Sequence, residues 1–145
     1  MRKVLCVCVD NTARSVMLAA LLQEELGNVA QVESAGISKK AGEGLPANVH
    51  TDQLMRHRGF DLSSHKSRRF DSLDLAQFSH IVCVDETTEE EVILSLVGCW
   101  MIEILVANEG GGGIPLTPEA GWQEHRACLA LLERTIPAIA RQIRG

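Results

Sequence analysis

The chain has 145 residues, of which 46% are hydrophobic and 23% charged, and its formal net charge is −5 at pH 7. This length fits one domain with a core of its own, so we expect a single domain over residues 1–145. The negative charge argues against general binding to nucleic acid or to an anionic membrane. No stretch approaches the roughly 20 apolar residues of a membrane span, and we expect a cytoplasmic protein.

The five cysteines, at positions 6, 8, 83, 99 and 128, are scattered and include no Cys-x2-Cys pair. This spacing is not typical of a zinc site, and we expect no metal. Free thiols in a reducing cytoplasm are the simplest interpretation of Cys6, Cys8, Cys83, Cys99 and Cys128. We also expect no cofactor, since the chain has no Gly-x4-Gly-Lys-Ser/Thr or Gly-x-Gly-x-x-Gly string for a nucleotide.

Apolar runs and turn signals in the first half predict two strands and two helices. A buried strand at 4–7 is followed by a helix over 15–26 that ends at Gly27, and by a second strand over 29–33 that a turn at 34–36 ends. A surface loop at 38–45 precedes a helix that begins near Pro46 and ends at Gly59. Residues 60–70 are polar and irregular.

The second half repeats this alternation. A third buried strand over 81–85 ends in an acidic cap for a helix over 86–97, and a fourth strand spans 101–106. A glycine loop at 110–113 precedes a last helix that begins near Glu119 or Trp122, and Pro137 should kink or interrupt that helix. Four strands that alternate with helices predict an α/β domain with a parallel sheet.

The stretch Cys8-Val9-Asp10-Asn11-Thr12-Ala13-Arg14-Ser15 lies between the first strand and the first helix. At such a turn, free backbone N–H groups and the positive end of the helix dipole converge, which suits a tetrahedral oxyanion. The guanidinium of Arg14 can bind two oxygens of that anion at once, and the same field favours a thiolate at Cys8. The stretch therefore predicts a phosphate-binding loop with a cysteine nucleophile.

A cysteine followed by five residues, arginine and serine is the signature of cysteine-dependent phosphatases. With Asn11 and its N-terminal position, the loop resembles that of the low-molecular-weight protein-tyrosine-phosphatase family. Ser34-Ala35-Gly36 and the string Gly-Phe-Asp-Leu-Ser-x-His-x-x-Arg at 59–68 are similar to two further segments of that family. Right-handed crossovers and the resemblance together imply a flavodoxin-like, three-layer domain, with helices on both faces of a four-stranded parallel sheet of order 2-1-3-4.

The resemblance also implies a role for each site residue. Cys8 would form a phosphocysteine, Arg14 would bind the equatorial phosphate oxygens, and Ser15 would hydrogen-bond the sulfur and help it leave. Asn11 would support the loop through hydrogen bonds that involve Ser34 and His65, although His65 can equally be read as a solvated loop histidine. The implied partners are a phosphorylated protein or a small aryl phosphate, with inorganic phosphate as product or inhibitor.

Three positions depart from the family pattern. Asp10 stands where the family usually has Gly, and Ala13 where many members carry a second cysteine. The family takes its general acid from an Asp-Pro pair before the last helix, but here Thr117 stands in place of the Asp. A threonine hydroxyl cannot act as an acid near pH 7. Glu119 is the nearest carboxylate and the candidate substitute, with helix N-terminal charge as its alternative role.

Three functions compete on these observations. The leading hypothesis is a phosphatase for phosphotyrosine or other aryl phosphates, weakened by the missing acid. The second is a phosphate- or phosphopeptide-binding pseudophosphatase. The third, arsenate reduction, needs two further cysteines in relay, and although Cys83 stands near one expected position, residue 90 is Glu rather than Cys.

Overall fold

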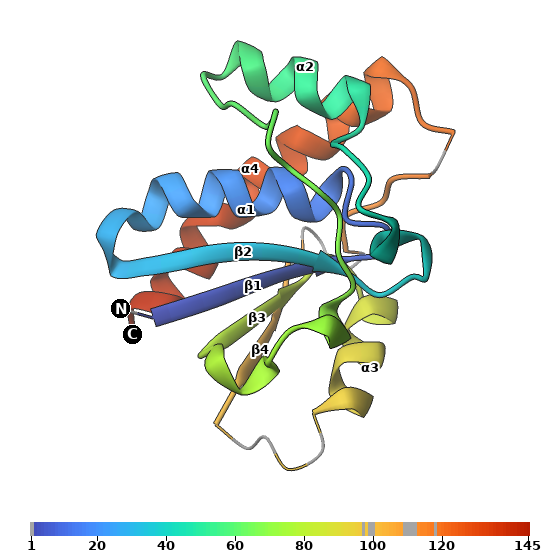
Figure 1. Ribbon diagram of the computed structural model, residues 1–145. Coiled ribbons are helices and arrows are strands. Elements are labelled where there is room, and N and C mark those ends of the chain that lie inside the picture. Colours follow the sequence, from blue (N-terminus) through green and yellow to red (C-terminus); the bar gives the residue numbers. More distant parts are fainter. Residues whose placement is uncertain (1, 97, 99–100, 109–112, 118) are drawn as a thin grey trace.

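The computed structural model describes residues 2–96, 98, 101–108, 113–117 and 119–145. Within them, four parallel strands form a sheet in the order β2-β1-β3-β4, with β1 at Arg2–Cys8, β2 at Ala30–Gly36, β3 at His80–Cys83 and β4 at Glu103–Val106. Helices cover both faces of this sheet (Figure 1). The predicted α/β class, sheet order and three layers are confirmed.

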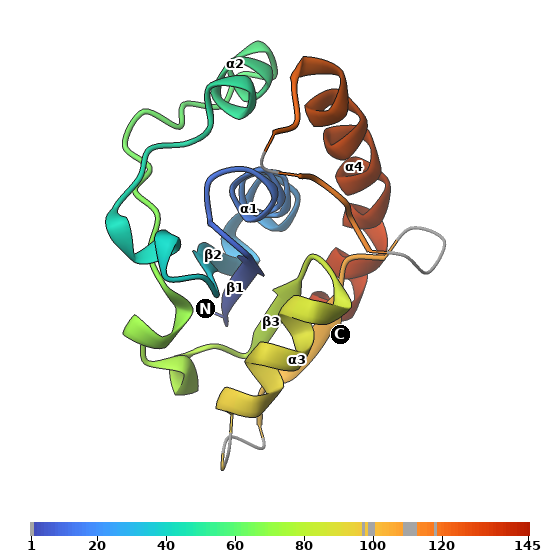
Figure 2. The same cartoon turned by 90° about the vertical axis from the view of Figure 1, so that its right-hand side faces the viewer.

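The helices divide unequally between the two faces. Helices α1 (Arg14–Leu26) and α4 (Trp122–Arg144) pack on one face, and α3 (Glu86–Ser95) covers the other (Figure 2). Helix α2 (Val49–His57) lies outside the sheet and contacts α4. Among the described residues, no helix is long and apolar enough to cross a membrane.

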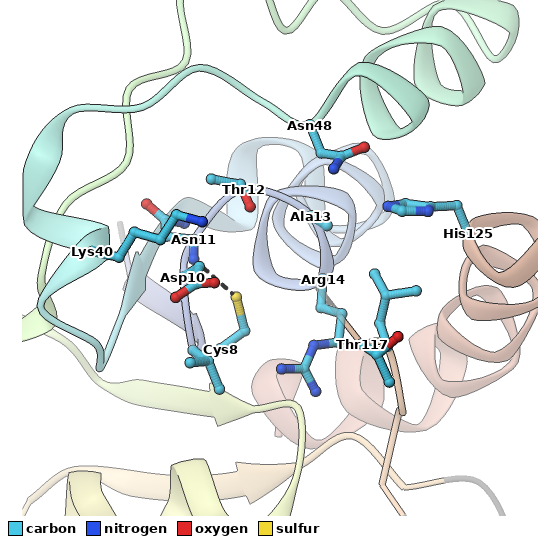
Figure 3. A pocket seen from close by; sticks show the side chains of 12 residues that line it. Cys8, Asp10, Asn11, Thr12, Ala13, Arg14, Lys40, Asn48, Thr117 and His125 are labelled. Carbon is cyan, nitrogen blue, oxygen red and sulfur yellow. Dashed lines mark hydrogen bonds between the residues drawn. The ribbon is translucent and has the colours of Figure 1, made fainter. Parts of the chain in front are cut away.

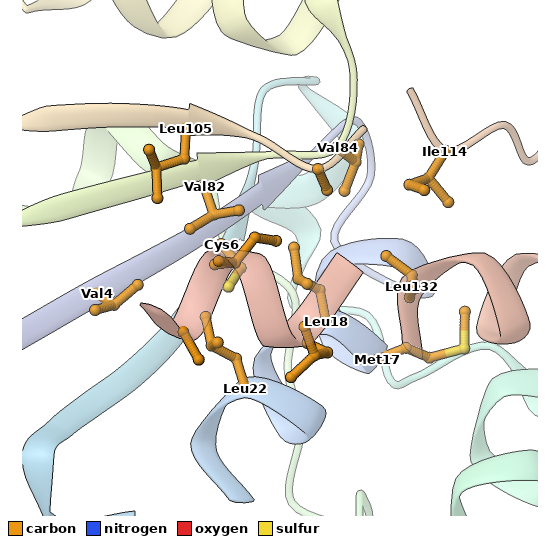
Figure 4. Close-up of a cluster of buried hydrophobic side chains, with 14 of the residues drawn as sticks. Val4, Cys6, Met17, Leu18, Leu22, Val82, Val84, Leu105, Ile114 and Leu132 are labelled. Carbon is orange, nitrogen blue, oxygen red and sulfur yellow. The ribbon is translucent and has the colours of Figure 1, made fainter. Parts of the chain in front are cut away.

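The core is split by β1, whose successive side chains point to opposite faces. On the α1 and α4 face, Val4 and Cys6 belong to one buried cluster with Leu18, Leu22 and Leu132 (Figure 4). On the other face, Leu5 and Val7 pack in a cluster that includes Val92 of α3. A strand buried on both faces is typical of the centre of a parallel sheet and explains its continuous apolar sequence.

Two predicted boundaries in the first half are wrong. Ser34-Ala35-Gly36 is the end of β2 rather than a turn, because it pairs with Cys6, Val7 and Cys8 of β1. The helix expected from Pro46 begins at Val49, where the side chain of Asn48 accepts a hydrogen bond from the backbone N–H of His50 at 2.8 Å. This side-chain cap sets the start of α2 more strongly than proline does.

In the second half, the prediction of an acidic cap is confirmed, since Asp85 caps α3 through the backbone N–H of Thr88. Helix α4 runs without interruption through Pro137, contrary to one predicted outcome. Proline removes one hydrogen bond there, and the buried Ile139 and Ile143 beyond it keep the helix on the core. The glycines at 110–112, Cys99 and the predicted helix end at 97 lie outside the described residues.

Candidate active site

The predicted loop lies at the carboxyl end of β1, where a ligand is expected in a doubly wound sheet. It borders a pocket of about 200 Å³. The pocket is lined by residues 8–14 of the loop, by Lys40 and Asn48, and by Leu116, Thr117 and His125 from the last part of the chain (Figure 3). Segments distant in the sequence therefore meet at one cavity around the loop.

The sulfur of Cys8 has two polar neighbours inside the loop. The backbone N–H of Asn11 donates to it at 3.3 Å, and Ser15 Oγ lies 3.0 Å from it. Ser15 Oγ also accepts a hydrogen bond from Asn11 Nδ2 at 2.8 Å, so its own proton is free to point at the sulfur. Cys8, Asn11 and Ser15 are all buried, and they form a connected network.

Asn11 has a backbone conformation that a residue with a side chain rarely adopts. Its φ is 58°, and it is the one non-glycine residue with positive φ in the part of the chain that the structure describes. Its amide donates to Ser34 Oγ at 3.0 Å and accepts from the Arg68 N–H at 3.0 Å, while His65 Nε2 lies 2.8 Å from its carbonyl oxygen. Since a carbonyl only accepts, Nε2 of His65 carries the proton.

Sequence reasoning named Asn11, Ser34 and His65 and missed Arg68. The Arg68 guanidinium donates to the Ser34 carbonyl at 3.0 Å and to Glu33 at 2.7 Å, which holds its backbone beside the loop. The family-like string at 59–68 includes Arg68, but it does not indicate the hydrogen bond from the Arg68 N–H to Asn11.

Gly36 lies beneath the loop, opposite Cys8 in the sheet register. A Cβ at this position would lie 2.5 Å from the Val9 carbonyl oxygen, 2.8 Å from Ala41 Cβ and 3.0 Å from the Asn11 nitrogen. Real Cβ atoms do not approach backbone this closely, so the loop rests directly on glycine backbone.

Arg14 is held by two acceptors on one nitrogen. Its Nη1 donates to Asp85 Oδ2 at 3.0 Å and to the Ile114 carbonyl at 3.0 Å. No described residue accepts from Nε or Nη2, and the side chain projects from the loop into the pocket (Figure 3). Partial burial acts to raise the pKa of Asp85, but hydrogen bonds from Thr88 and the charge of Arg14 hold that pKa below its usual value.

The start of α1 is open to an anion. Ala13 at its N-cap provides no side-chain hydrogen bond, and the first turn contains no acidic residue. The first backbone N–H groups of a helix have no partner within the helix itself. Here these N–H groups face the same loop as Arg14. The positive charge of the guanidinium and the backbone hydrogen-bond donors are therefore at the same place.

Asp10 adds a carboxylate to the rim of this pocket. Its Oδ1 accepts a hydrogen bond from Ser38 Oγ at 2.7 Å, and it lies beside Cys8 on the same side as Lys40 (Figure 3). The φ of Asp10 is not positive. The backbone at this position therefore does not need the glycine that the family usually has. The carboxylate is only partly exposed, and its charge acts on any anion in the loop.

The wall opposite Asp10 contains no carboxylate among the described lining residues. Thr117 is exposed and lines the pocket, whereas Glu119 is exposed and does not line it. The structure therefore does not bring Glu119 to Cys8.

His125, in the first turn of α4, was missed by sequence reasoning. It is 2% exposed and lines the pocket; its Nδ1 lies 2.9 Å from the Gly121 carbonyl oxygen, so Nδ1 carries a proton. Its Nε2 is buried without a hydrogen-bond partner among the described residues. In the sequence, its spacing from Cys128, Leu129 and Leu132 indicates a core-facing position, and only its nearness to the expected acid segment could have singled it out.

The other described thiols are buried. Burial raises the pKa of Cys83 and of Cys128 to about 12 and that of Cys6 still further. Cys83 packs on the α3 face of the sheet, whereas Cys8 packs on the α1 and α4 face. This arrangement does not support a thiol relay between Cys8 and Cys83.

Comparison with known proteins identifies the family of the chain. The model of the family described as low molecular weight phosphotyrosine protein phosphatase matches residues 3–144. A probable low molecular weight protein-tyrosine-phosphatase, EpsP, of Ralstonia nicotianae is 32% identical over 91 residues, which cover 63% of this chain and 61% of that protein. A protein-arginine-phosphatase of Geobacillus stearothermophilus is 29% identical over 91 residues, which cover 63% of this chain and 60% of that protein.

The matched part thus spans about three fifths of the length of these curated relatives. Solved structures agree over the whole fold: Vibrio vulnificus Wzb in complex with benzylphosphonate has a TM-score of 0.85 at 23% identity, covering 97% of this chain and 98% of that one. The YwlE arginine phosphatase from Geobacillus stearothermophilus has a TM-score of 0.84 at 22% identity, covering 99% and 94%. The chain belongs to the low molecular weight phosphotyrosine protein phosphatase family.

Proposed function

We propose that this protein is a cysteine-dependent phosphatase that hydrolyses phosphorylated protein side chains through a phosphocysteine intermediate. The observation that carries the proposal is the convergence of groups on one loop. The Cys8 sulfur has two polar neighbours at 3.0 and 3.3 Å, and the part of the Arg14 guanidinium that no described residue binds projects into the same pocket. Family membership supports the class of reaction, and these residues support its mechanism.

In the first step, the phosphate group sits against the uncapped N-terminus of α1, with Arg14 donating to two of its oxygens. The Cys8 thiolate attacks phosphorus. A sulfur–phosphorus bond forms while the bond from phosphorus to the leaving atom breaks, and that atom takes up a proton. Arg14 and the backbone donors stabilise the charge that the equatorial oxygens carry in the transition state.

In the second step, water attacks the phosphocysteine and the sulfur–phosphorus bond breaks. The sulfur departs as a thiolate, which the hydroxyl of Ser15 and the N–H of Asn11 stabilise from 3.0 and 3.3 Å. Because Asn11 Nδ2 donates to Ser15 Oγ, the serine proton is directed at the sulfur. Inorganic phosphate is released, and since it fits the same loop it also inhibits.

Phosphotyrosine or another aryl phosphate is the first substrate class, as in the family name. Phosphoarginine is a second candidate because the pocket is polar where a side chain would enter. Asp10, Asn48 and Thr117 line it, and a carboxylate at the rim suits the cationic, donor-rich guanidinium group. One curated relative is a protein-arginine-phosphatase.

The test compares nitrophenyl phosphate, a phosphotyrosine peptide and a phosphoarginine peptide as substrates of the native protein and of Cys8→Ser. We expect turnover that Cys8→Ser abolishes, and acid quenching should trap a phosphoryl group on Cys8, located by mass spectrometry. Cys83→Ala is the matched control, since it removes a buried thiol on the opposite face of the sheet.

Phosphate binding without turnover of any substrate would contradict catalysis and identify a phosphate- or phosphopeptide-binding pseudophosphatase. Turnover that persists in Cys8→Ser would place the reaction elsewhere. The ratio of the two peptide rates decides between phosphotyrosine and phosphoarginine.

A further inference from the structure

The leaving group of a phosphate ester needs a proton, and the described residues place no carboxylic acid on the pocket wall opposite Cys8. Thr117 cannot supply one, and Glu119 does not line the cavity. Asp10 is the carboxylate of the described lining, but it lies beside Cys8 (Figure 3). In an in-line displacement the leaving atom lies opposite the attacking sulfur, so a donor is needed on the other wall.

We propose that His125 is the catalytic acid for the leaving group; this inference rests on the proposed phosphatase function. His125 projects from α4 towards the pocket, on the wall across from Cys8 and Asp10 (Figure 3). It is 2% exposed, yet its Nε2 has no partner among the described residues. A buried polar atom without a partner costs about 1–3 kcal/mol, so such an atom on a residue that lines a pocket points to a ligand.

The tautomer of His125 favours this role. Its Nδ1–H donates to the Gly121 carbonyl at 2.9 Å, which anchors the ring and leaves Nε2 as the ring nitrogen without a partner among the described residues. The ring is also flanked by that of His50, with centroids 5.1 Å apart, and His50 in turn packs against Trp122 at 5.8 Å. These contacts hold the His125 ring in one position.

The proton balance closes over the two steps. In the proposed step, the imidazolium form of His125 passes its Nε2–H to the leaving oxygen as the phosphorus–oxygen bond breaks. The neutral imidazole then accepts a proton at Nε2 from the water that attacks the phosphocysteine. Phosphate leaves, Cys8 is again a thiolate, and His125 is again an imidazolium, so no further reactant is required.

The test uses aryl phosphates whose leaving phenols range in pKa from about 7 for nitrophenol to about 10 for phenol. A good leaving group needs little help from an acid. We expect His125→Gln to lower kcat about 10²-fold or more on phenyl phosphate and less than about 5-fold on nitrophenyl phosphate, which steepens the dependence of rate on leaving-group pKa. Glu119→Gln, an exposed carboxylate outside the pocket, should leave that dependence unchanged.

The inhibition constant of inorganic phosphate checks that the loop of His125→Gln is intact, and His125→Asn provides a second variant without the acid. If His125→Gln lowers kcat equally on both substrates, or on neither, His125 is not the acid. Phosphocysteine trapped in the same experiment would still support the phosphatase function. Steepening in Asp10→Asn but not in His125→Gln would assign the proton to Asp10 instead. Absence of turnover and of phosphocysteine in the native protein would overturn both proposals together.

Discussion

The two sides of the pocket are built in different ways. On the nucleophile side, Cys8 and Asn11 are buried, and contacts from Ser34, His65 and Arg68 hold the Asn11 backbone at a positive φ. On the opposite side, Thr117 is exposed and its hydroxyl makes no hydrogen bond to another described residue.

His125 is the buried polar residue of that second wall, and its position depends on helix packing. It lies one turn before Cys128 and Leu129, which belong to the core between α4 and the sheet. In the proposed mechanism, a hydrogen-bond network positions the loop that binds phosphate, whereas the orientation of one helix decides which side chain faces the leaving group. A substitution on the nucleophile side should lower the turnover of every substrate by a similar factor. A substitution on the opposite side should lower turnover by factors that differ between substrates.

Arg14→Lys should produce the largest loss, and on all substrates alike. Lysine keeps the charge but not the planar guanidinium that binds two oxygens at once. We expect kcat/KM on nitrophenyl phosphate to fall about 10²–10³-fold. Phosphate should also cease to protect Cys8 from iodoacetamide, as mapped by mass spectrometry. Protection equal to that of the native protein would show that the loop binds oxyanions without Arg14.

Asn11→Ala and Asn11→Gly separate backbone strain from side-chain hydrogen bonds. Alanine at a φ of 58° adds about 1–2 kcal/mol of strain to the loss of the three amide contacts, which are worth about 1 kcal/mol each, so we expect a destabilisation of about 4–5 kcal/mol. Glycine adopts this φ without strain, so Asn11→Gly should lose less stability than Asn11→Ala. Urea unfolding measures both, and equal losses in the two variants would mean that the backbone at Asn11 is not strained.

Thr117→Asp tests the second side by adding a carboxylic acid to the wall. In the His125→Gln protein it should raise kcat on phenyl phosphate about 10-fold, as partial recovery of general acid catalysis. In the protein that keeps His125, the gain should be below about 3-fold, because one acid suffices. A large gain in both backgrounds would mean that His125 does not donate the proton.

Asp10→Asn should have a smaller effect, confined to anion binding. Removing one negative charge near a bound phosphate is worth up to about 1 kcal/mol at a partly exposed rim, so inorganic phosphate should inhibit about 2–5-fold more tightly. The gain should shrink as salt screens the charge. Glu86→Gln, which removes an exposed carboxylate on α3, is the control. Equal inhibition before and after the change would place the Asp10 charge outside the reach of the anion.

The pair of Arg14 and Asp85 predicts the smallest effect, on stability. Because the pKa of Asp85 is lower in the folded than in the unfolded chain, its contribution is complete above the unfolded value, about 3.9, and is lost as pH falls through the folded value. Asp85→Asn should therefore lower the unfolding midpoint at pH 7, and the difference from the native protein should narrow below pH 4. A constant difference across this range would exclude the charged Asp85 carboxylate, with its contacts to Thr88 and Arg14, as its cause.

The sequence predicted those features that neighbouring residues determine. The strand, loop and helix from Arg2 to Leu26 follow from one apolar run and one contiguous motif, and the sheet order follows from chain connectivity and the family resemblance. Residues 34–36 were misread as a turn because their small side chains hide a strand that pairing with β1 creates. Local propensity is overridden there by tertiary contacts.

Within the site, contacts between distant segments were the ones missed. Arg14 and Asp85 are 71 positions apart, and the sequence indicated only that Asp85 would cap a helix. The orientation of His125 depends on how α4 is rotated against the sheet, which periodicity alone does not specify. The roles assigned to Cys8, Ser15 and Asn11 stay predictions until the variants are measured.

Gly36 has a consequence for how catalysis can be altered without touching a catalytic group. Since its Cα supports the carbonyl of Val9 and the nitrogen of Asn11, one added methyl group must lift the loop relative to the sheet. Arg14 would remain tied at Nη1 to Asp85 and Ile114, which belong to segments that the methyl group does not touch. Alanine at position 36 would thus change the distance between the Cys8 sulfur and the Arg14 guanidinium while leaving both groups intact. A loss of activity in that variant would report the spacing of the two groups rather than their chemistry.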